Sequence, residues 1–318
     1  MSQQTIITDP KRKKSYLHRL ALNIIHHKWA YLMLIPVVAY YILFHYGPLY
    51  GVQIAFKDFS PGKGITGSKW VGFKHFISFF QGVYFTRTIR NTLAINIYGL
   101  IWGFPAPIIL ALLLDEVHHL KFKKLVQTVT YLPHFISTVV ICGILSNFCQ
   151  TNGLFNNLAS ALVPGYTKVA LLSRPELFRT LYIGSNIWQS IGWNSIIFIA
   201  ALAGVDAELY DAIAVDGGNR WHRVRHVSIP CILPTVVIML IMRIGNMMSV
   251  GSEKIILMYN ESTYEVADVI STYVYRRGLL EFAYSFSAAV GLFNNIINFI
   301  LVNIANSVSR KVTETSLW

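Results

Sequence analysis

The stretch ELYDAIAVDGGNRWHRVRHVSIPCILP, residues 208–234, is charged and contains two adjacent glycines, yet it lies between two of the most apolar runs of the chain. Its apolar residues before the glycines recur at helical spacing and predict a short helix. Gly217 and Gly218 end that helix, and Asn219 can cap a second one. We therefore expect a polar helical elbow over about 206–230, joining two apolar segments.

The composition of the whole chain is that of a membrane protein. Of its 318 residues, 54% are hydrophobic and 13% are charged, and the mean hydropathy is +0.48. A soluble domain of this composition would expose large apolar patches. The expected fold class is an all-α polytopic membrane protein. The formal charge of +12 is explained by cytoplasmic flanks that face anionic membrane lipid, so no nucleic-acid partner is expected.

Six runs are long and apolar enough to cross a bilayer as helices. They cover residues 29–46, 91–114, 128–149, 178–202, 231–250 and 287–308. Prolines within or beside these runs are tolerated in lipid, because neighbouring helices satisfy the freed backbone groups. The expected organisation is one transmembrane domain over 29–308 between tails at 1–28 and 309–318.

Basic residues predict the orientation of the chain in the membrane. The tail 1–28 carries six Lys or Arg residues and one Asp, so the positive-inside rule places it in the cytoplasm. Six crossings return the C-terminus, with Arg310 and Lys311, to the same side. The elbow then also lies in the cytoplasm.

No catalytic or metal site is predicted. The run GKGITG has the glycine spacing of a phosphate loop, but Ser68 and Lys69 follow it in the wrong order. The three cysteines and the two His-His pairs show no metal-ligand spacing, and no hydrolase constellation is present. Energy for transport is therefore expected from a partner or from an ion gradient.

The elbow resembles the EAA motif, E-A-A-x3-G-x9-I-x-L-P, of type I ABC importer permeases. Residues 211–213, Gly217 and residues 227–230 stand at its positions. Asp211 replaces the usual Glu and is one methylene shorter, which changes the reach of any ion pair made there. The other departures keep apolar or small character; they are Ile213 and Ile229 in the motif and Gly218 after Asp-Gly.

Segments outside the elbow carry the resemblance over nearly the whole chain. FHYGPLYG at 44–51, AFKDF at 55–59 and WVGF at 70–73 are similar to the LplB-like permeases of complex-polysaccharide importers, in the maltose-type branch of carbohydrate uptake. The resemblance implies a type I permease fold in the bacterial plasma membrane. It also implies a second, homologous permease, an ATPase dimer that binds ATP and Mg, and an extracellular or periplasmic solute-binding protein; this chain itself would bind no cofactor.

For the elbow, the resemblance implies docking in a groove of the ATPase, whose closure tilts the permease helices between inward-open and outward-open states. The residues expected to couple the two movements are Asp211, Ala212, Asp216, Gly217, Arg220, Arg223 and Pro230. The alternative is a charged, solvated loop between spans.

Polar and aromatic residues within the predicted spans indicate a substrate pathway, because such groups are costly in lipid unless they face a cavity. They are Asn186, Trp188, Gln189, Trp193, Asn194, Arg243, Asn246, Asn294 and Asn298. Amides and guanidinium groups bind sugar hydroxyls, while aromatic faces pack on sugar rings. Arg243 could also pair with a carboxylate of an acidic oligosaccharide. The alternative is that these residues only join helices to one another.

The sequence therefore predicts the permease of an ATP-driven importer of oligosaccharides derived from a complex polysaccharide. Uronate-bearing fragments, of pectin, rhamnogalacturonan or alginate type, are the preferred substrate class. A secondary transporter or channel is one alternative, but it would more often show inverted repeats or a buried proton-carrying acid. A membrane enzyme is the other, and it lacks the expected nucleophile and metal constellations.

Overall fold

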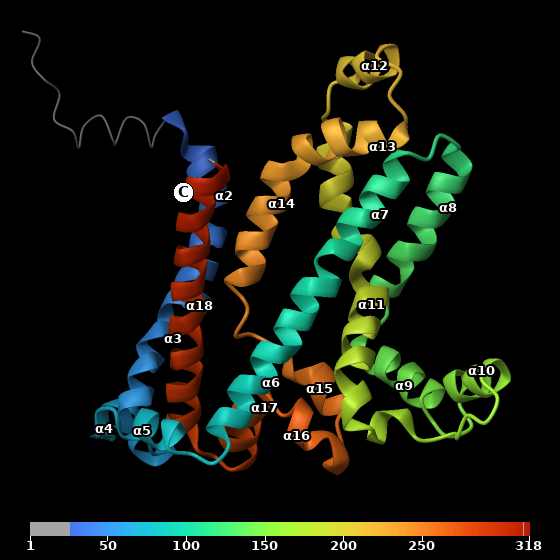
Figure 1. Cartoon of the computed structure of the whole chain (residues 1–318). Helices are drawn as coiled ribbons and strands as arrows, with labels where there is room; N and C mark the ends of the chain where they lie inside the picture. Colours follow the sequence, from blue (N-terminus) through green and yellow to red (C-terminus); the bar gives the residue numbers. More distant parts are fainter. Residues whose placement is uncertain (1–25, 314) are drawn as a thin grey trace, which may run out of the picture. The chain divides into compact units, whose positions relative to one another are not determined.

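The computed structural model of the chain describes residues 26–313 and 315–318 (Figure 1). Most of the predicted N-terminal tail, including its basic cluster, lies outside the described residues. The chain divides into two units, Met1–Gln53 and Ile54–Trp318, and each is described by itself. The described residues are mainly helical.

The described part of the first unit is a continuous helical stretch. α2 (Lys28–Tyr41) runs through a π-helical turn, η1 (Ile42–Tyr46), into α3 (Gly47–Leu49). Extended by η2 (Tyr50–Phe56), which crosses the border between the units, the stretch has 29 residues and a mean hydropathy of 1.6. It is long and apolar enough to cross a bilayer, and it contains the predicted first span.

The second unit contains four long helical stretches. They are Phe85–Asp115, made of α6 (Phe85–Tyr98), η4 (Gly99–Gly103) and α7 (Pro105–Asp115); α11 (Pro175–Ala203); Arg220–Ile244, made of α13 (Arg220–Arg223), η7 (Val224–Ser228) and α14 (Ile229–Ile244); and α18 (Tyr284–Thr313). Of these four stretches, all except α11 have the length and hydropathy of a membrane span. Together with the stretch of the first unit, they make 4 candidate spans among the described residues. The apolar run of α11 is interrupted by Asn186, Gln189 and Asn194.

Three of these helical stretches widen into a π-helical turn just before a proline. η1, η4 and η7 end two residues before Pro48, Pro105 and Pro230, respectively. A proline has no N–H to donate, and its ring collides with the carbonyl one turn back in a regular α-helix. The wider turn removes that collision. The prolines are thus accommodated without ending the helices.

The predicted third span, 128–149, is not one straight helix. α8 (Leu120–Tyr131) and α9 (Thr138–Phe148), with the 3-10 turn η5 (Leu132–Phe135) between them, meet at a bend of 101° and together make one further candidate span. Pro133 lies at the start of η5, and Ser137 restarts the helix by accepting a hydrogen bond from the Val140 amide at 3.4 Å. The helix therefore begins earlier than expected and changes direction where the sequence predicted its centre.

The predicted fifth span, 231–250, is also displaced. The helix begins at Arg220, because the basic arm of the elbow continues through η7 into α14, and it ends at Ile244. Arg243 is therefore in the last turn of the helix, not in the middle of a span. Residues 245–248 form a turn, and the Met248 amide donates to Asn298 Oδ1 on α18 at 2.9 Å. Six crossings remain a prediction.

Shorter elements complete the second unit. They are β1 (Lys57–Asp58), η3 (Pro61–Lys63), α4 (Gly64–Gly67), β2 (Lys69–Trp70), α5 (Lys74–Phe80), α10 (Leu154–Leu162), η6 (Leu171–Ser173), α12 (Ala207–Val215), α15 (Ser252–Met258), η8 (Glu261–Thr263), α16 (Tyr264–Ala267), α17 (Ile270–Tyr275) and η9 (Arg276–Leu280). The strands pair antiparallel, with Lys57 opposite Trp70. Within this unit, α12 and α13 lie at one end of the long helices, and α9, α10, α15 and α16 gather at the other (Figure 1).

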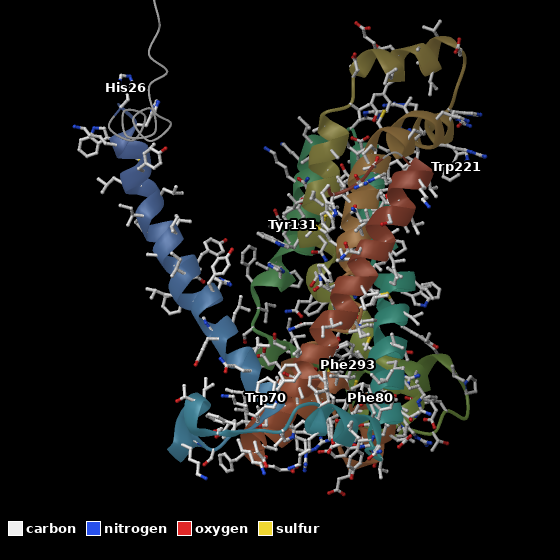
Figure 2. The ribbon with its side chains drawn as sticks, turned by 90° about the vertical axis from the view of Figure 1, so that its left-hand side faces the viewer. His26, Trp70, Phe80, Tyr131, Trp221 and Phe293 are labelled. Carbon is white, nitrogen blue, oxygen red and sulfur yellow. The ribbon has the colours of Figure 1, made fainter. Side chains whose placement is uncertain are left out.

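Apolar packing joins the helices of the second unit at several levels. At the α12 end, Ala111, Phe198 and Ile232 connect α7, α11 and α14. At the opposite end, a second cluster that includes Phe178 and Ile255 connects α11 to α15. α5 packs on α18 through aromatic pairs such as Phe80–Phe293, whose ring centroids are 5.4 Å apart (Figure 2). These contacts hold α11 at both ends and leave its middle to line a cavity.

Candidate functional site

The first arm of the elbow is a capped helix. Asp206 precedes α12 and accepts a hydrogen bond from the Glu208 amide at 3.0 Å. Both carboxylates lie at the N-terminal end of the helix, where the helix dipole favours negative charge. The cluster of acids in the sequence therefore begins the helix.

Two glycines turn the chain after α12, as predicted. Gly217 has φ of +74°, a conformation that residues with a Cβ rarely adopt. The Gly218 amide donates to the Ile213 carbonyl at 2.8 Å, and a Cβ on Gly218 would lie 2.4 Å from Ile213 Cγ2. Gly218 is thus required by close packing, whereas Gly217 is required by its backbone angle.

The second arm begins at Asn219, which was the predicted cap. Asn219 Oδ1 accepts from the His222 amide at 3.1 Å, and the Asn219 amide donates to His222 Nδ1 at 3.3 Å. This reciprocal pair is a capping box built with a histidine. The prediction of two helices around a glycine turn is confirmed, although the second helix is continuous with α14.

Tyr210 connects the two arms, and the sequence did not single it out. The Arg223 guanidinium lies 4.9 Å from the centre of its ring, and its hydroxyl lies 3.1 Å from Ser228 Oγ. The same hydroxyl donates to the Asp115 carboxylate at 3.5 Å. Burial raises the pKa of Tyr210, so the phenol stays protonated at neutral pH. An aromatic residue on a helix that also carries acidic residues was the only signal in the sequence.

The predicted coupling residues divide into an exposed and a packed group. The exposed group is Asp211, Ala212, Asp216, Gly217, Arg220 and Pro230. Arg223 is partly buried against Tyr210. Apolar side chains accompany the exposed group: Val215 is 88% and Trp221 65% exposed, and Trp221 projects away from the helices (Figure 2). The elbow thus presents mixed charged and apolar side chains, as a surface for a protein partner does.

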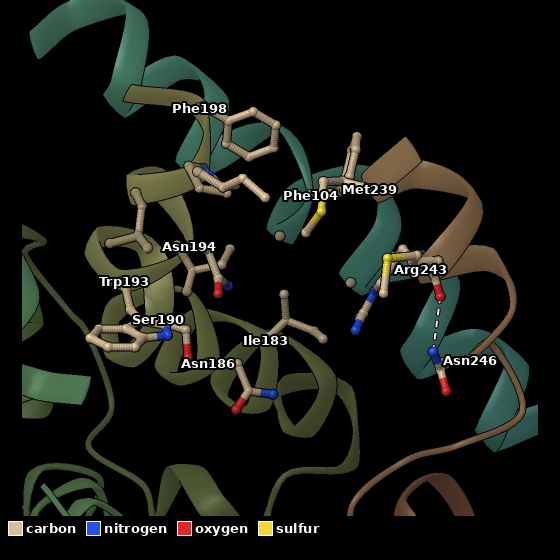
Figure 3. A pocket seen from close by; sticks show the side chains of 17 residues that line it. Phe104, Ile183, Asn186, Ser190, Trp193, Asn194, Phe198, Met239, Arg243 and Asn246 are labelled. Carbon is tan, nitrogen blue, oxygen red and sulfur yellow. Dashed lines mark hydrogen bonds between the residues drawn. The ribbon is translucent and has the colours of Figure 1, made fainter. Parts of the chain in front are cut away.

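A cavity of about 640 Å³ opens between the long helices of the second unit. It is lined by residues of η4 and α7, of the middle of α11, and of the end of α14. Five predicted pathway residues line it: Asn186, Trp193, Asn194, Arg243 and Asn246. Figure 3 shows the residues of α11 on one side of the cavity and Arg243 on the other. These five residues thus lie around one cavity, although α11 and α14 are separated by the whole elbow, and their role as a substrate pathway stays a prediction.

Arg243 is the positive charge of the cavity wall. Gly99 of η4 lies so close to it that a Cβ there would be 2.8 Å from Arg243 Nη2. Within the described chain Arg243 forms no ion pair. A cation without a neighbouring acid, in a wall that is otherwise amide and apolar, attracts an anionic or strongly polar ligand.

Four other predicted pathway residues do not line this cavity. Gln189 donates to the Ile136 carbonyl at 3.4 Å and so contacts the break between α8 and α9. Asn298 accepts from the Met248 amide and donates to Ser249 Oγ at 2.9 Å. Trp188 is 48% exposed, and Asn294 lies on α18, which is not part of the cavity wall. Gln189 and Asn298 instead join elements, the alternative that their sequence left open.

Two residues near the cavity were not predicted from the sequence. Lys254 of α15 donates from Nζ to Asn186 Oδ1 at 2.7 Å, and burial lowers its pKa to about 8. His134 of η5 stacks on Trp193, with ring centroids 4.4 Å apart and planes 4° apart. Lys254 gave no signal, because a lone lysine between two predicted spans is indistinguishable from a solvated loop residue. His134 could have been suspected from the proline beside it, which breaks the helix.

A cavity lined by amides and one guanidinium inside an apolar helical unit, together with a helical elbow at one end, defines the membrane-embedded component of a transport system. The family described as "Binding-protein-dependent transport system inner membrane component" matches residues 76–314, and the chain belongs to this family. Its fold is that of a type I ABC permease. It carries out no ATP hydrolysis itself, because in this family a separate subunit does so.

Individual relatives are similar over almost their whole length. Protein LplB of Bacillus subtilis (strain 168) is 42% identical over 92% of this chain and 91% of its own. The polygalacturonan/rhamnogalacturonan transport system permease protein YteP of the same organism is 40% identical over 96% and 95%. A chain of a bacterial alginate ABC transporter, solved with an alginate pentasaccharide-bound periplasmic protein, superposes with a TM-score of 0.86 at 41% identity, covering 94% of this chain and 100% of that chain.

Proposed function

We propose that the chain is the permease subunit of an importer for acidic oligosaccharides, such as uronate-bearing fragments of pectin, rhamnogalacturonan or alginate. The observation that carries this proposal is the cavity on α11 and α14, where amides and an indole accompany Arg243. Amides suit hydroxyl groups, the indole suits a sugar ring and the guanidinium suits a carboxylate. Relatives with polygalacturonan/rhamnogalacturonan and alginate in their names support the same substrate class.

The proposal includes the topology and the assembly. The chain crosses a bacterial plasma membrane six times, with both termini in the cytoplasm, and pairs with a homologous but different permease. A solute-binding protein delivers the oligosaccharide on the outer side. A cytoplasmic ATPase dimer binds ATP and Mg and receives the elbow, while this chain binds no cofactor. The exposed Val215 and Trp221 beside the charged residues of α12 and α13 support that docking.

ATP hydrolysis by the complete complex in lipid discs tests the substrate. The binding protein would be loaded in turn with oligogalacturonate, oligomannuronate and neutral oligosaccharides of equal length. We expect stimulation by one acidic ligand and little by the neutral ones. Stimulation by neutral ligands alone would retain the importer and exclude the acidic substrate.

The elbow is tested through the backbone angle of Gly217. A Gly217→Val variant should insert and assemble but lose most of the transport, because valine at a φ of +74° costs about 1–2 kcal/mol and distorts the turn. Gly217→Asn is the matched control, since asparagine adopts this conformation more readily. Uptake and membrane abundance would be measured together. Full transport by the valine variant would exclude the elbow as the coupling element.

A further inference from the structure

Lys254 is a buried cation whose role the cavity residues alone do not explain. Its side chain belongs to α15, and the residue is 6% exposed. The ammonium lies 5.8 Å from the centre of the Tyr182 ring and 2.7 Å from Asn186 Oδ1. Among the ion pairs of the described residues, none involves Lys254. A buried ammonium that has an amide beside it but forms no ion pair remains largely uncompensated.

Asn186 connects this cation to the cavity. The side chain of Asn186 lines the cavity beside the residues already described (Figure 3). Because its Oδ1 accepts from Lys254, the carbonyl end of the amide is held away from ligands, and its nitrogen is the donor end. The Tyr182 hydroxyl is a side-chain hydrogen-bond partner of Asn186, so one N–H group can serve Tyr182 and the other a ligand. A positive charge on the carbonyl side also polarises the amide, which strengthens those donors. The wall around Asn186 therefore favours a ligand that accepts hydrogen bonds.

We propose that Lys254 is a positioning residue for substrate selection: it orients Asn186 as a donor and, together with Arg243, makes the cavity prefer a sugar carboxylate over the corresponding neutral ester. The inference rests on the proposed function, since it concerns the same cavity and the same acidic substrate class. It extends that function by assigning the choice between charged and uncharged saccharides to Lys254. This residue does not line the cavity but is hydrogen-bonded to Asn186, which does.

A second lysine–asparagine pair provides a matched control. Lys168 donates to Asn157 Oδ1 at the same distance, 2.7 Å, but this pair is exposed. Neither residue lines the cavity. The two pairs have the same chemistry and differ in burial and in position. If the preference for the acidic ligand changes when Lys254 is substituted but not when Lys168 is, the change depends on the cavity.

The experiment measures binding of a galacturonate trisaccharide and of its methyl ester to the complex in lipid discs, without the binding protein, by equilibrium dialysis. We expect the unmodified complex to prefer the acid. Lys254→Gln, which keeps a donor for Asn186 but removes the charge, should reduce that preference about tenfold or more. Lys254→Arg should retain most of it, and Lys168→Gln should leave it unchanged. A thermal unfolding curve for each variant checks that the fold is intact.

The pH dependence of the preference is a second readout. Burial lowers the pKa of Lys254 to about 8, so the ammonium is charged at pH 7 and largely neutral at pH 9. The acid preference of the unmodified complex should therefore fall over this range, while that of Lys254→Arg should fall much less. Titratable neighbours are Cys142 of α9, Tyr182 of α11 and Glu253 of α15, and all three are present in both proteins.

The outcomes separate this inference from the proposed function. If the unmodified complex prefers the acid and Lys254→Gln prefers it equally, Lys254 only fastens α15 to α11 and the inference is wrong, while the proposed function stands. If the unmodified complex does not distinguish acid from ester, the acidic substrate and the role of Lys254 both fail. A reduced preference in Lys254→Gln with retention in Lys254→Arg supports the inference.

Discussion

Two charge clusters in the second unit differ in whether their charges are compensated. Near α16 and α17, the fully buried carboxylate of Asp268 pairs with Arg87 Nη2 at 2.8 Å and with Arg276 Nη2 at 2.9 Å. It also accepts from the Thr272 hydroxyl at 2.8 Å. At the cavity, Arg243 and Lys254 have no acid partner among the described residues. Positive charge is thus neutralised in the first cluster and left available in the second.

The difference indicates separate roles for the two clusters. A buried acid held by two arginines joins segments of the fold. Removing it leaves Arg276 without an acid and Arg87 with only Glu265, at 3.7 Å. A cavity cation without an acid contributes little to the fold and is available for a ligand. The same types of charged residue therefore stabilise one region and, in our proposal, bind substrate in the other. The following predictions test this contrast, beginning with the largest expected effect.

Replacing Asp268 by Asn should cause the largest loss of stability. The variant leaves Arg87 and Arg276 without their common acid, which costs about 3–5 kcal/mol in buried pairs of this kind. Thermal unfolding of the solubilised protein would measure the change. A double variant, Asp268→Asn with Arg276→Gln, should recover part of the loss because one unpaired cation is removed. A loss below about 1 kcal/mol in the single variant would refute the structural role of this cluster.

Replacing Arg243 by Gln should instead affect transport while sparing stability. Uptake of an acidic oligosaccharide should fall about tenfold or more, equivalent to about 1.4 kcal/mol. The unfolding temperature should not fall, because no ion pair is broken. Arg243→Lys, which retains the charge, is the matched control and should retain part of the uptake. The contrast between the clusters would be wrong if Arg243→Gln destabilised the protein as strongly as Asp268→Asn.

The stability of the folded protein should rise with pH through the titration of Lys254. The folded-state pKa of about 8 lies below the usual lysine value of 10.5, so between these values the unfolded chain binds a proton that the folded chain does not. Stability therefore increases as the pH rises through this window. Comparing unfolding temperatures at pH 7.5 and 9.5 for the unmodified protein and Lys254→Met isolates the contribution. The same pH response in both proteins would show that Lys254 is not a buried cation.

The smallest effect is expected at an exposed ion pair. Asp58 and Lys74 lie 3.2 Å apart, with side chains that are 55% and 56% exposed. Asp58→Asn should change the free energy of unfolding by about 0–1 kcal/mol, because solvent screens such pairs. Salt titration of the unfolding temperature provides a control, since a screened pair responds weakly. An effect comparable to that of Asp268→Asn would show that burial does not distinguish the two sites.

Features that depend on neighbours along the chain could be predicted from the sequence. The helices, the glycine turn at 217–218 and the cap at Asn219 follow from local spacing, because capping and φ preferences involve only a few adjacent residues. Helical periodicity placed Asn186, Gln189 and Trp193 on one face, of which Asn186 and Trp193 line the cavity and Gln189 does not. The same reasoning misplaced the ends of the third and fifth spans, since hydropathy does not indicate where a helix bends at Pro133 or stops at Ile244.

By itself, the sequence determined the membrane class, the elbow and a polar face on α11. Only the tertiary structure decided which charges are compensated. Asp268 meets Arg87 across 181 residues, and Lys254 meets Asn186 across 68. Such pairs form when separate helices pack together, and no periodicity along the chain encodes them. Their energies depend on burial and on the presence of a counter-charge, which are properties of the packed structure.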